Sequence, residues 1–245
     1  MAKKILFVLL LLTLLASGCA KSSSPTASLS PEKVVQTFLQ ASTNGNVETC
    51  FSLLADDVLF RQEQMGVKIN GKAQLESALR QLAAWHTQYT VIGQMKTEGD
   101  KVRFTIRQTG DEYQIMGLEY ITGDLEAEVH DGKIKSWSVT VKPGDLQKIA
   151  ELTAGGIGIK FEVVAEGIRI TEIAENSPLN DTGVKPGDLI VAVNGVPYSQ
   201  MREGEIQLRI KGPVGSKVKL TVTHEGAPAP IEIEITRIDM TKVSF

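Results

Sequence analysis

The chain has 245 residues, which is room for one large domain or for two domains of ordinary size. Its 26 lysines and arginines are balanced by 29 aspartates and glutamates, so the formal net charge is −3 at pH 7. A charge of that size and sign excludes a general electrostatic attraction to nucleic acid. We therefore expect no nucleic-acid partner.

The N-terminus has the pattern of a secretory signal. Two lysines precede an apolar run over residues 5–15, which suits the central region of a signal peptide and is too short to cross a bilayer as a helix. The run leads into Leu15-Ala16-Ser17-Gly18-Cys19, which resembles a bacterial lipobox, although the motif more often has leucine at the position of Ala16. The resemblance implies that residues 1–18 are removed and that Cys19 is lipidated. The alternative is a plain secretory signal with an incidental cysteine.

Residues 19–28 are polar and rich in serine, which is typical of a flexible tether. Two or more acyl chains on Cys19 would anchor the protein stably. We therefore predict a lipid-anchored protein of the bacterial cell envelope that faces the periplasm or the exterior. Cys50 then has no intramolecular partner and is expected to be buried as a small apolar residue. The few cysteines and histidines do not follow the spacing of a zinc site, and we expect no bound metal.

The predicted elements begin with three helices. Ser30 is a suitable N-cap and Pro31 a suitable first-turn residue, and apolar residues then recur with helical spacing until Asn44-Gly45. A second helix is predicted over 47–54. A third is predicted from 72 to 85, with leucines along one face.

Segments in which apolar and polar residues alternate follow the helices, as in half-buried strands. Glycine-containing turns between them indicate hairpins. An earlier strand follows the second helix directly, and Asp56 and Asp57 are expected to cap the helix or form a turn before it. The predicted strands cover 57–61, 90–98, 101–108, 113–128 and 133–141.

This order of elements over residues 29–145 resembles the nuclear transport factor 2-like superfamily, which includes the SnoaL and ketosteroid isomerase groups. The resemblance implies three helices on a curved antiparallel sheet, which together form a cone with a pocket inside. Members range from enzymes to modules that only dimerise, so the fold does not settle the function. A homodimer through the cone is left open.

Isomerases of this fold have a catalytic base a few residues after the Asp-Asp pair, which is the position of Gln62 in this chain. An amide cannot abstract a proton, so we predict no catalytic residue, no enzyme activity and no cofactor. His86, at the end of the third helix, is the remaining candidate for acid–base chemistry. A histidine at that position also interacts favourably with the last carbonyl groups of the helix, and we prefer that interpretation.

A short helix over 145–152 is predicted to connect the first domain to a second one, with residues 146–154 as the linker. Four turn or glycine-rich motifs then follow. They are Gly155-Gly156-Ile157-Gly158-Ile159, Asn176-Ser177-Pro178, Val184-Lys185-Pro186-Gly187-Asp188 and Asn194-Gly195. In this order they resemble a bacterial PDZ domain over residues 155–240, most closely the kind found in C-terminal processing peptidases. The resemblance implies a partly open β-barrel or sandwich, so that the whole chain is of the α+β class.

The glycine-rich segment is the predicted binding site for the carboxylate of a C-terminal peptide. Glycines let successive backbone N–H groups turn toward one point, where they can hold an anion. The peptide would add a strand beside residues 159–163, flanked on its other side by a helix predicted over 200–210. For Met201 and Leu208, simple core packing is the alternative. The predicted carboxylate-binding residues are Gly156, Ile157, Gly158 and Ile159, and the predicted groove residues are Met201, Ile206 and Leu208.

The processing peptidases continue into a serine–lysine protease domain, whereas this chain ends at Phe245. We therefore predict a non-catalytic, membrane-anchored adaptor or scaffold that binds C-terminal peptides of envelope proteins, with a protease as one candidate partner. The alternative is an enzyme whose site is the cone pocket and which the PDZ domain targets. Residues 241–245 form a C-terminal tail. Its apolar Val243 and Phe245 fit a pattern that some PDZ domains accept in a neighbour's groove, although a frayed end is the simpler expectation.

Overall fold

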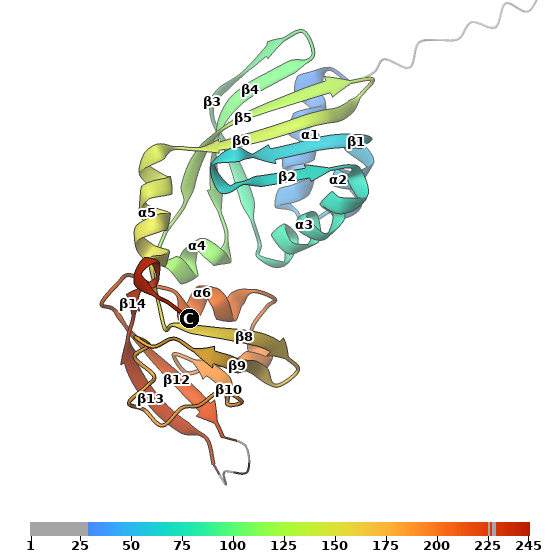
Figure 1. Ribbon diagram of the computed structural model, residues 1–245. Coiled ribbons are helices and arrows are strands. Elements are labelled where there is room, and N and C mark those ends of the chain that lie inside the picture. Colours follow the sequence, from blue (N-terminus) through green and yellow to red (C-terminus); the bar gives the residue numbers. More distant parts are fainter. Residues whose placement is uncertain (1–28, 225, 227–228) are drawn as a thin grey trace, which may run out of the picture.

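The computed structural model describes residues 29–224, 226 and 229–245. The predicted signal peptide, Cys19 and the tether lie outside these described residues. Two domains follow each other along the chain and are joined by helix α5 (Pro143–Thr153), as Figure 1 shows. No helix within the described ranges is long and apolar enough to cross a membrane.

The N-terminal domain begins with the three predicted helices, which are confirmed. Ser30 caps the first helix by accepting a hydrogen bond from the N–H of Lys33 at 3.3 Å, and Asn46 caps the second by accepting one from Thr49 at 2.9 Å. Side-chain caps of this kind satisfy N–H groups that a helix leaves unpaired. The helices are α1 (Pro31–Thr43), α2 (Val47–Leu53) and α3 (Lys72–Ala84).

A single curved sheet covers these helices, and its strands lie in the order β2-β1-β6-β5-β4-β3. β1 pairs with β6 in parallel, so the sheet predicted as antiparallel is mixed at this one junction. A 3₁₀ turn (Glu63–Met65) joins β1 to β2. The strands are β1 (Leu54–Gln62), β2 (Val67–Asn70), β3 (Gln88–Glu98), β4 (Lys101–Thr109), β5 (Ile121–His130) and β6 (Lys133–Val141).

The hydrophobic core of this domain lies between the helices and the sheet. Val35 of α1 is fully buried, and the rings of Phe38 and Trp137 lie 4.9 Å apart between centroids. Cys50 belongs to the same core, and its burial confirms the prediction for this residue. Because the thiolate is desolvated there, burial raises the pKa of the Cys50 thiol to about 11.

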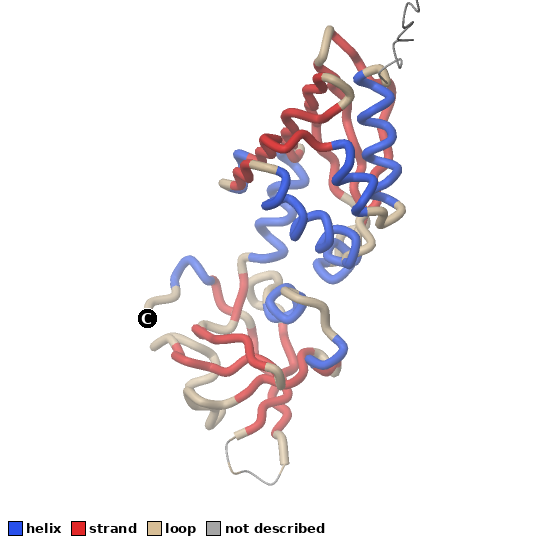
Figure 2. Tube along the Cα trace, turned by 90° about the vertical axis from the view of Figure 1, so that its right-hand side faces the viewer, coloured by secondary structure: helices blue, strands red, loops and turns tan. Residues whose placement is uncertain are grey.

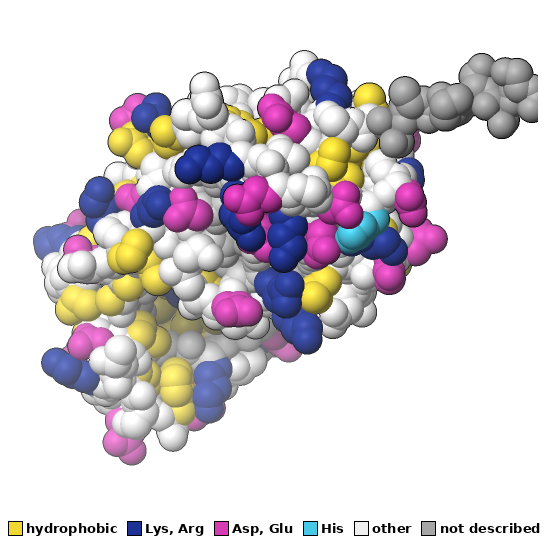
Figure 3. Space-filling model, turned by 90° about the horizontal axis from the view of Figure 1, so that it is seen from above, with side chains coloured by type: hydrophobic (Ala, Val, Ile, Leu, Met, Phe, Trp, Pro, Cys, Tyr) yellow, Lys and Arg dark blue, Asp and Glu magenta, His cyan; other side chains and the backbone are white. Residues whose placement is uncertain are grey.

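The outer surface of the sheet is polar and carries ion pairs between neighbouring strands. Arg103 of β4 lies 2.6 Å from Glu126 of β5 and 2.9 Å from Glu98 of β3. Seen from above in Figure 3, basic and acidic side chains lie among one another over this end of the molecule. Such exposed pairs contribute little to stability, so the buried apolar face holds the sheet on the helices.

The prediction of one long strand over 113–128 was wrong in its first part. Residues Asp111–Met116 form a short helix, α4, and the strand begins only at Ile121. The two acidic residues in the first turn of α4 suit the positive end of a helix dipole. Gly117, with φ +83°, then ends the helix in a conformation that favours glycine.

The expected turn at Asp56 and Asp57 is also absent, because β1 already begins at Leu54. Both aspartates lie in this strand with exposed side chains. The carboxylate of Asp57 lies 2.7 Å from Nζ of Lys135 on the neighbouring β6. The ion pair between Asp57 and Lys135 therefore links β1 to β6, and Asp57 does not cap α2.

The C-terminal domain is mainly β-structure, with a sheet in the order β13-β12-β10-β9-β8. β11 adds to β10, and β7 pairs with β14 close to the chain end. The elements are β7 (Gly155–Gly156), β8 (Ile159–Val164), β9 (Gly167–Ile173), β10 (Leu189–Val193), β11 (Val196–Pro197), α6 (Glu205–Ile210), β12 (Lys217–Thr223), β13 (Ile231–Thr236) and β14 (Ile238–Asp239), with 3₁₀ turns at Tyr198–Gln200 and Met240–Lys242.

The helix predicted over 200–210 is shorter than expected. Only its second half is helical, as α6, because Gly204 precedes it with φ +77° and ψ −11°. That left-handed conformation does not occur inside a right-handed helix. The first half consists of the end of a 3₁₀ turn and an irregular stretch that contains Met201.

The two domains contact each other where α4 meets α6. In both views α6 lies between the C-terminal sheet and the N-terminal domain (Figures 1 and 2). The guanidinium group of Arg202 lies 2.6 Å from the carboxylate of Asp111 and 5.2 Å from the ring centroid of Trp85. The predicted connecting helix is confirmed as α5, and Leu146 and Ile149 pack it against the N-terminal domain.

Candidate functional site

The glycine-rich loop of the C-terminal domain is held in place by Ser177. Its hydroxyl donates a hydrogen bond to the carbonyl of Ile157 at 2.7 Å and accepts one from the N–H of Leu179 at 3.2 Å. The N–H of Ala174 donates to the carbonyl of Gly158 at 2.9 Å. Gly158 itself has φ +65°, a left-handed conformation that favours glycine. These contacts hold the loop in the conformation that the structure describes.

These bonds fix the direction of two N–H groups. In a trans peptide the carbonyl of one residue and the N–H of the next point in opposite directions. Because the carbonyls of Ile157 and Gly158 point to Ser177 and Ala174, the N–H groups of Gly158 and Ile159 point away from these inner partners. Two of the N–H groups predicted to hold a carboxylate thus point away from these bonds inside the domain.

Gly156 and Ile157 take other places in the loop. Gly156 pairs with Ile238 in the β7–β14 ribbon, and a Cβ at this position would collide with the side chain of Met240. The side chain of Ile157 is 1% exposed and belongs to the core. The binding of a carboxylate by Gly156, Ile157, Gly158 and Ile159 stays a prediction.

Strand β8 is at the edge of its sheet and pairs only with β9 among the strands of that sheet. Ile159 and Phe161 pack toward the core. Lys160 and Glu162 lie on the exposed face, where Lys160 pairs with Glu172 at 2.7 Å. The backbone groups along a free edge are a template for an added strand.

Helix α6 presents two faces, and the predicted groove residues Ile206 and Leu208 lie on different ones. Ile206 is 2% exposed in the core of the C-terminal domain, and Met201 packs against the same core. Leu208, in contrast, lines a cavity of the N-terminal domain. Side chains two positions apart on a helix do not share a face, so Ile206 and Leu208 cannot both line one groove.

A buried arginine holds the C-terminal end of α6. Arg237 donates hydrogen bonds to the carbonyls of Ile210 at 2.7 Å and Arg209 at 2.9 Å, which are carbonyls of the last turn. A third bond reaches the carbonyl of Lys217 on β12 at 2.7 Å. A Cβ at Gly212 would collide with this guanidinium group. The position of α6 is therefore fixed by the sheet beneath it.

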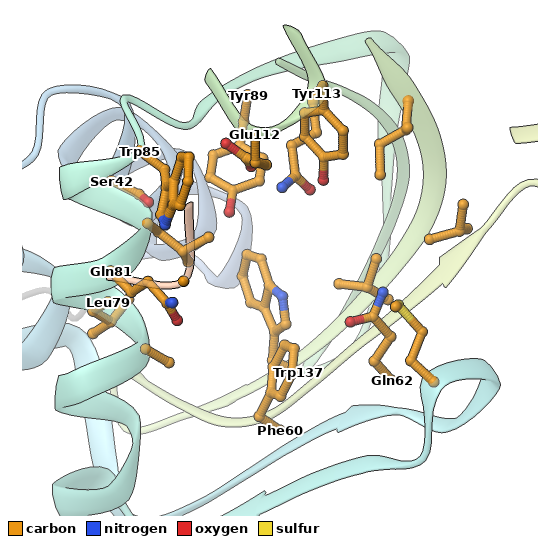
Figure 4. Close-up of a pocket in the computed structure, with 18 of the residues that line it drawn as sticks. Ser42, Phe60, Gln62, Leu79, Gln81, Trp85, Tyr89, Glu112, Tyr113 and Trp137 are labelled. Atoms are coloured by element: carbon orange, nitrogen blue, oxygen red, sulfur yellow. The ribbon is translucent and has the colours of Figure 1, made fainter. Parts of the chain in front are cut away.

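A partly open cavity of about 620 Å³ lies in the N-terminal domain between α3, the sheet and α4 (Figure 4), and α6 of the C-terminal domain adds to its wall. Gln62, at the position where isomerases of this fold have a base, does lie on its wall. The other polar side chains on the wall include three further glutamines, a serine, a threonine and Lys211. Six aromatic side chains line the cavity, namely Phe38, Phe60, Trp85, Tyr89, Tyr113 and Trp137.

The cavity also contains a carboxyl group, that of Glu112 on α4, which the sequence did not single out. Its Oε1 accepts a hydrogen bond from the hydroxyl of Thr87 at 3.4 Å, whereas its buried Oε2 has no hydrogen-bond partner within the described residues. Burial raises the pKa of Glu112. Gly110 leaves room for this carboxyl group, because a Cβ there would collide with it.

His86 lies outside the cavity and does not point to acid–base chemistry there. The backbone N–H of His86 donates to the carbonyl of Ala83 at the end of α3, at 3.1 Å. In the side chain, Nδ1 of His86 lies 2.7 Å from Oδ2 of Asp111. The hydrogen bond from His86, helped by Arg202, lowers the pKa of Asp111. Over the described ranges, no cluster of histidine, cysteine or acidic side chains could hold a metal ion.

The C-terminal tail lies against the C-terminal domain of its own chain. The side chain of Asn176 donates to the carbonyl of Lys242 at 2.9 Å, and Nζ of Lys160 lies 4.4 Å from the ring centroid of Phe245. Lys160 is on the exposed face of β8, so Phe245 rests on that face. Docking of the tail in a neighbour's groove stays a prediction.

Comparison with protein families agrees with both resemblances. Residues 35–137 match the SnoaL-like domain and residues 155–235 match the PDZ domain. The chain therefore contains a SnoaL-like domain followed by a PDZ domain, and the helices and sheets of the two domains confirm the predicted α+β class.

Curated relatives are proteases that share part of the chain. A carboxy-terminal-processing protease of Bartonella bacilliformis is 24% identical over 144 residues, which are 55% of this chain and 33% of that protein. The carboxy-terminal processing protease CtpA of Bacillus subtilis is 35% identical over 82 residues, which are 34% of this chain and 17% of that protein. This chain thus spans a third or less of the length of these relatives. Among solved structures, an NTF2-like protein of unknown function from Cytophaga hutchinsonii has a TM-score of 0.41 at 16% identity, covering 50% of this chain and 98% of that one.

Proposed function

We propose that the PDZ domain binds the C-terminal segments of other proteins and that the protein acts as an adaptor or scaffold. The observation that carries the proposal is the combination of the free edge of β8 with the two N–H groups at Gly158 and Ile159, at the start of that strand. A peptide added to β8 would bring its own end to this loop. Backbone pairing would then hold the peptide, and the loop would hold its carboxylate.

The strengths of the expected interactions predict a micromolar affinity for such a peptide. Charge-assisted hydrogen bonds to the carboxylate contribute about 1.5–3 kcal/mol each, and burial of one apolar terminal side chain contributes about 1.5–3 kcal/mol. Ordering the peptide and the loss of its free motion offset much of this gain. A net free energy of about −8 kcal/mol corresponds to a dissociation constant of about 1 μM.

The adaptor role and the envelope location rest on the sequence and on the named relatives. Because those relatives are proteases, a protease or its substrates are the partners that we propose. Membrane attachment through Cys19 predicts that Cys19→Ala releases the protein into the soluble fraction. Unchanged retention in the membrane fraction would contradict the lipid anchor. Homodimerisation through the cone stays a prediction.

A second candidate function is proton-transfer chemistry in the cone cavity, and Glu112 is the observation that favours it. A general base must lie within reach of the substrate and have a pKa near the working pH. Glu112 lines the cavity, and burial raises its pKa. Deuterium incorporation next to the carbonyl of a probe ketone such as β-tetralone, present with the wild type and lost in Glu112→Gln, would support this function. Equal exchange by the two proteins would exclude Glu112 as the base.

The peptide-binding proposal is tested by titrating the protein against a library of fluorescent C-terminal peptides. A side chain at position 158 meets the left-handed backbone and the Cβ of Ser177 at 3.2 Å, so Gly158→Ala should distort the loop. We expect micromolar binding of a subset of peptides and at least tenfold weaker binding to Gly158→Ala. If no peptide binds, or if the variant binds equally well while remaining folded, the proposal fails.

A further inference from the structure

The C-terminal tail, together with the residue before it, lies on both sides of the glycine-rich loop. Before the loop, the N–H of Met240 donates to the carbonyl of Ala154 at 3.0 Å. The side chain of Met240 fills the space that a Cβ at Gly156 would need. Beyond the loop, the ring of Phe245 lies at Lys160 of β8, with 4.4 Å between its centroid and Nζ. The tail therefore contacts the chain next to the predicted carboxylate-binding residues.

The turn that holds the loop also holds the tail. The side chain of Asn176 donates to the carbonyl of Lys242 at 2.9 Å. The next residue in this turn, Ser177, donates to the carbonyl of Ile157 in the loop. Figure 1 shows the chain end, marked C, close to the start of β8 and on the side that faces α6. A peptide added to the free edge of β8 would have its last residues at this place.

We propose that the tail makes an autoinhibitory contact with the peptide site, in which Phe245 takes the place of the side chain next to the ligand's C-terminal residue. A ligand with a bulky side chain at that position must displace Phe245, whereas a ligand with glycine there leaves it in place. The inference rests on the proposed peptide binding and adds to it a regulation of the same site by the chain itself.

The alternation of side chains along β8 places the conflict at this one ligand position. A ligand that pairs with β8 and ends at the N–H of Ile159 has its next-to-last residue opposite Lys160. Residues opposite each other on paired strands have side chains on the same face, with Cβ atoms about 4.5–5.5 Å apart. Ile159 packs toward the core and Lys160 lies on the exposed face. The next-to-last ligand side chain is therefore on the face where Phe245 rests.

The contact of Phe245 is weak enough for a ligand to displace it. The ring of Phe245 is 49% exposed, and its contact with Lys160 is a cation–π contact at the surface. Loss of such a contact changes an equilibrium constant by roughly two- to fivefold. The tail should therefore reduce the affinity for bulky ligands by about this factor without closing the site to them.

The test titrates one library-selected peptide, made with glycine and with tryptophan at its next-to-last position. The proteins are the wild type, Phe245→Ala and a chain shortened by residues 243–245. We expect the tryptophan peptide to bind both variants about fivefold more tightly than the wild type. The glycine peptide should bind all three proteins within about twofold. Val214→Ala is the matched control, because Val214 is an exposed apolar residue of the same domain outside the tail.

Each other outcome contradicts the inference. An equal gain for both peptides, or no gain, would overturn the role of Phe245 and leave the proposed peptide binding intact. Weaker binding to variants that urea unfolding shows to be as stable as the wild type would mean that the tail forms part of the site and does not inhibit it. If neither peptide binds any of the proteins, the proposed peptide binding itself fails, and the autoinhibitory contact fails with it.

Discussion

The Glu112 carboxyl group links pH to the stability of the SnoaL-like domain. Its buried Oε2 has no hydrogen-bond partner among the residues that the structure describes, and burial raises the pKa of Glu112 in the folded protein. The uncharged form is thus favoured by folding. A carboxyl group whose pKa is higher in the folded state makes its full contribution to stability below its unfolded-state pKa, which is about 4.3 for glutamate. The contribution is lost as the pH rises through the higher folded-state pKa.

Replacing this group should remove that pH dependence. We expect Glu112→Gln and the wild type to differ little near pH 4. The variant should gain in relative stability as the pH rises toward 7.5, because only the wild type must then bury a charge. Urea unfolding at several pH values measures the difference in the free energy of unfolding. Glu119→Gln, at an exposed position beyond α4, is the control and should run parallel to the wild type. A parallel course for Glu112→Gln would contradict the prediction.

At the scale of residues, the sequence pointed to Gln62 on the cavity wall but did not single out Glu112. Counting along the first strand correctly brought Gln62 to the cavity wall. Glu112 follows Gly110 and Asp111, a pattern that only suggests the start of a helix. The direction of the Glu112 side chain depends on the short helix α4, on the space that Gly110 leaves and on the curvature of the sheet. These are tertiary features, and a local pattern does not contain them.

At the scale of elements, α6 serves the two domains with opposite faces. Its Ile206 is buried in the PDZ core, its Leu208 lines the cavity, and Arg237 bonds to its last carbonyls. The helix is only one and a half turns long, so it owes its stability to these tertiary contacts more than to its own hydrogen bonds.

Truncating one side chain on each face of α6 should therefore affect stability and peptide binding differently. Ile206→Ala should destabilise the protein by about 2–5 kcal/mol, as is usual for a buried isoleucine, and should weaken peptide binding. Leu208→Ala should cost less, because Leu208 is only partly buried, and should leave peptide affinity within about twofold. Urea unfolding and peptide titration of the two variants measure both effects. Equal loss of peptide binding in both would mean that Leu208 faces the groove after all.

The elements themselves were predicted best where the signals were local. Caps at Ser30 and a glycine turn after α1 marked the helices, and alternating residues marked β4 and β6. The parallel pairing of β1 with β6 was missed, because it joins segments such as Phe60 and Trp137 that are far apart in the sequence. The α6 helix was predicted too long, since the conformation of Gly204 is not evident from helical spacing.

At the scale of the whole molecule, Arg202 makes a polar contact between the domains. It pairs with Asp111 and stacks on Trp85, and Asp111 is itself bonded to His86. Partly buried pairs and cation–π contacts of this kind are each worth about 0.5–1 kcal/mol. The packing of α6 against the N-terminal domain should depend on them.

Loss of this contact should loosen the packing of α6 against the N-terminal domain without unfolding either domain. We expect Arg202→Ala to speed hydrogen exchange of the α6 backbone amides about fivefold, which corresponds to about 1 kcal/mol. Mass spectrometry of deuterium uptake measures the rate. Arg169→Ala, which removes an exposed ion pair with Glu162 on the same domain, should leave the exchange of α6 unchanged. Unchanged exchange of α6 in Arg202→Ala would show that other contacts hold the domains together.

The recognition of free C-termini by the PDZ domain rests on the N–H groups at Gly158 and Ile159 and on the edge of β8. The most direct measurement compares one library-selected peptide as a free acid and as its C-terminal amide, titrated against the same protein. Since each bond to the carboxylate is worth about 1.5–3 kcal/mol, amidation should weaken binding at least tenfold. Equal affinity of the acid and the amide would contradict the recognition of C-termini by this loop.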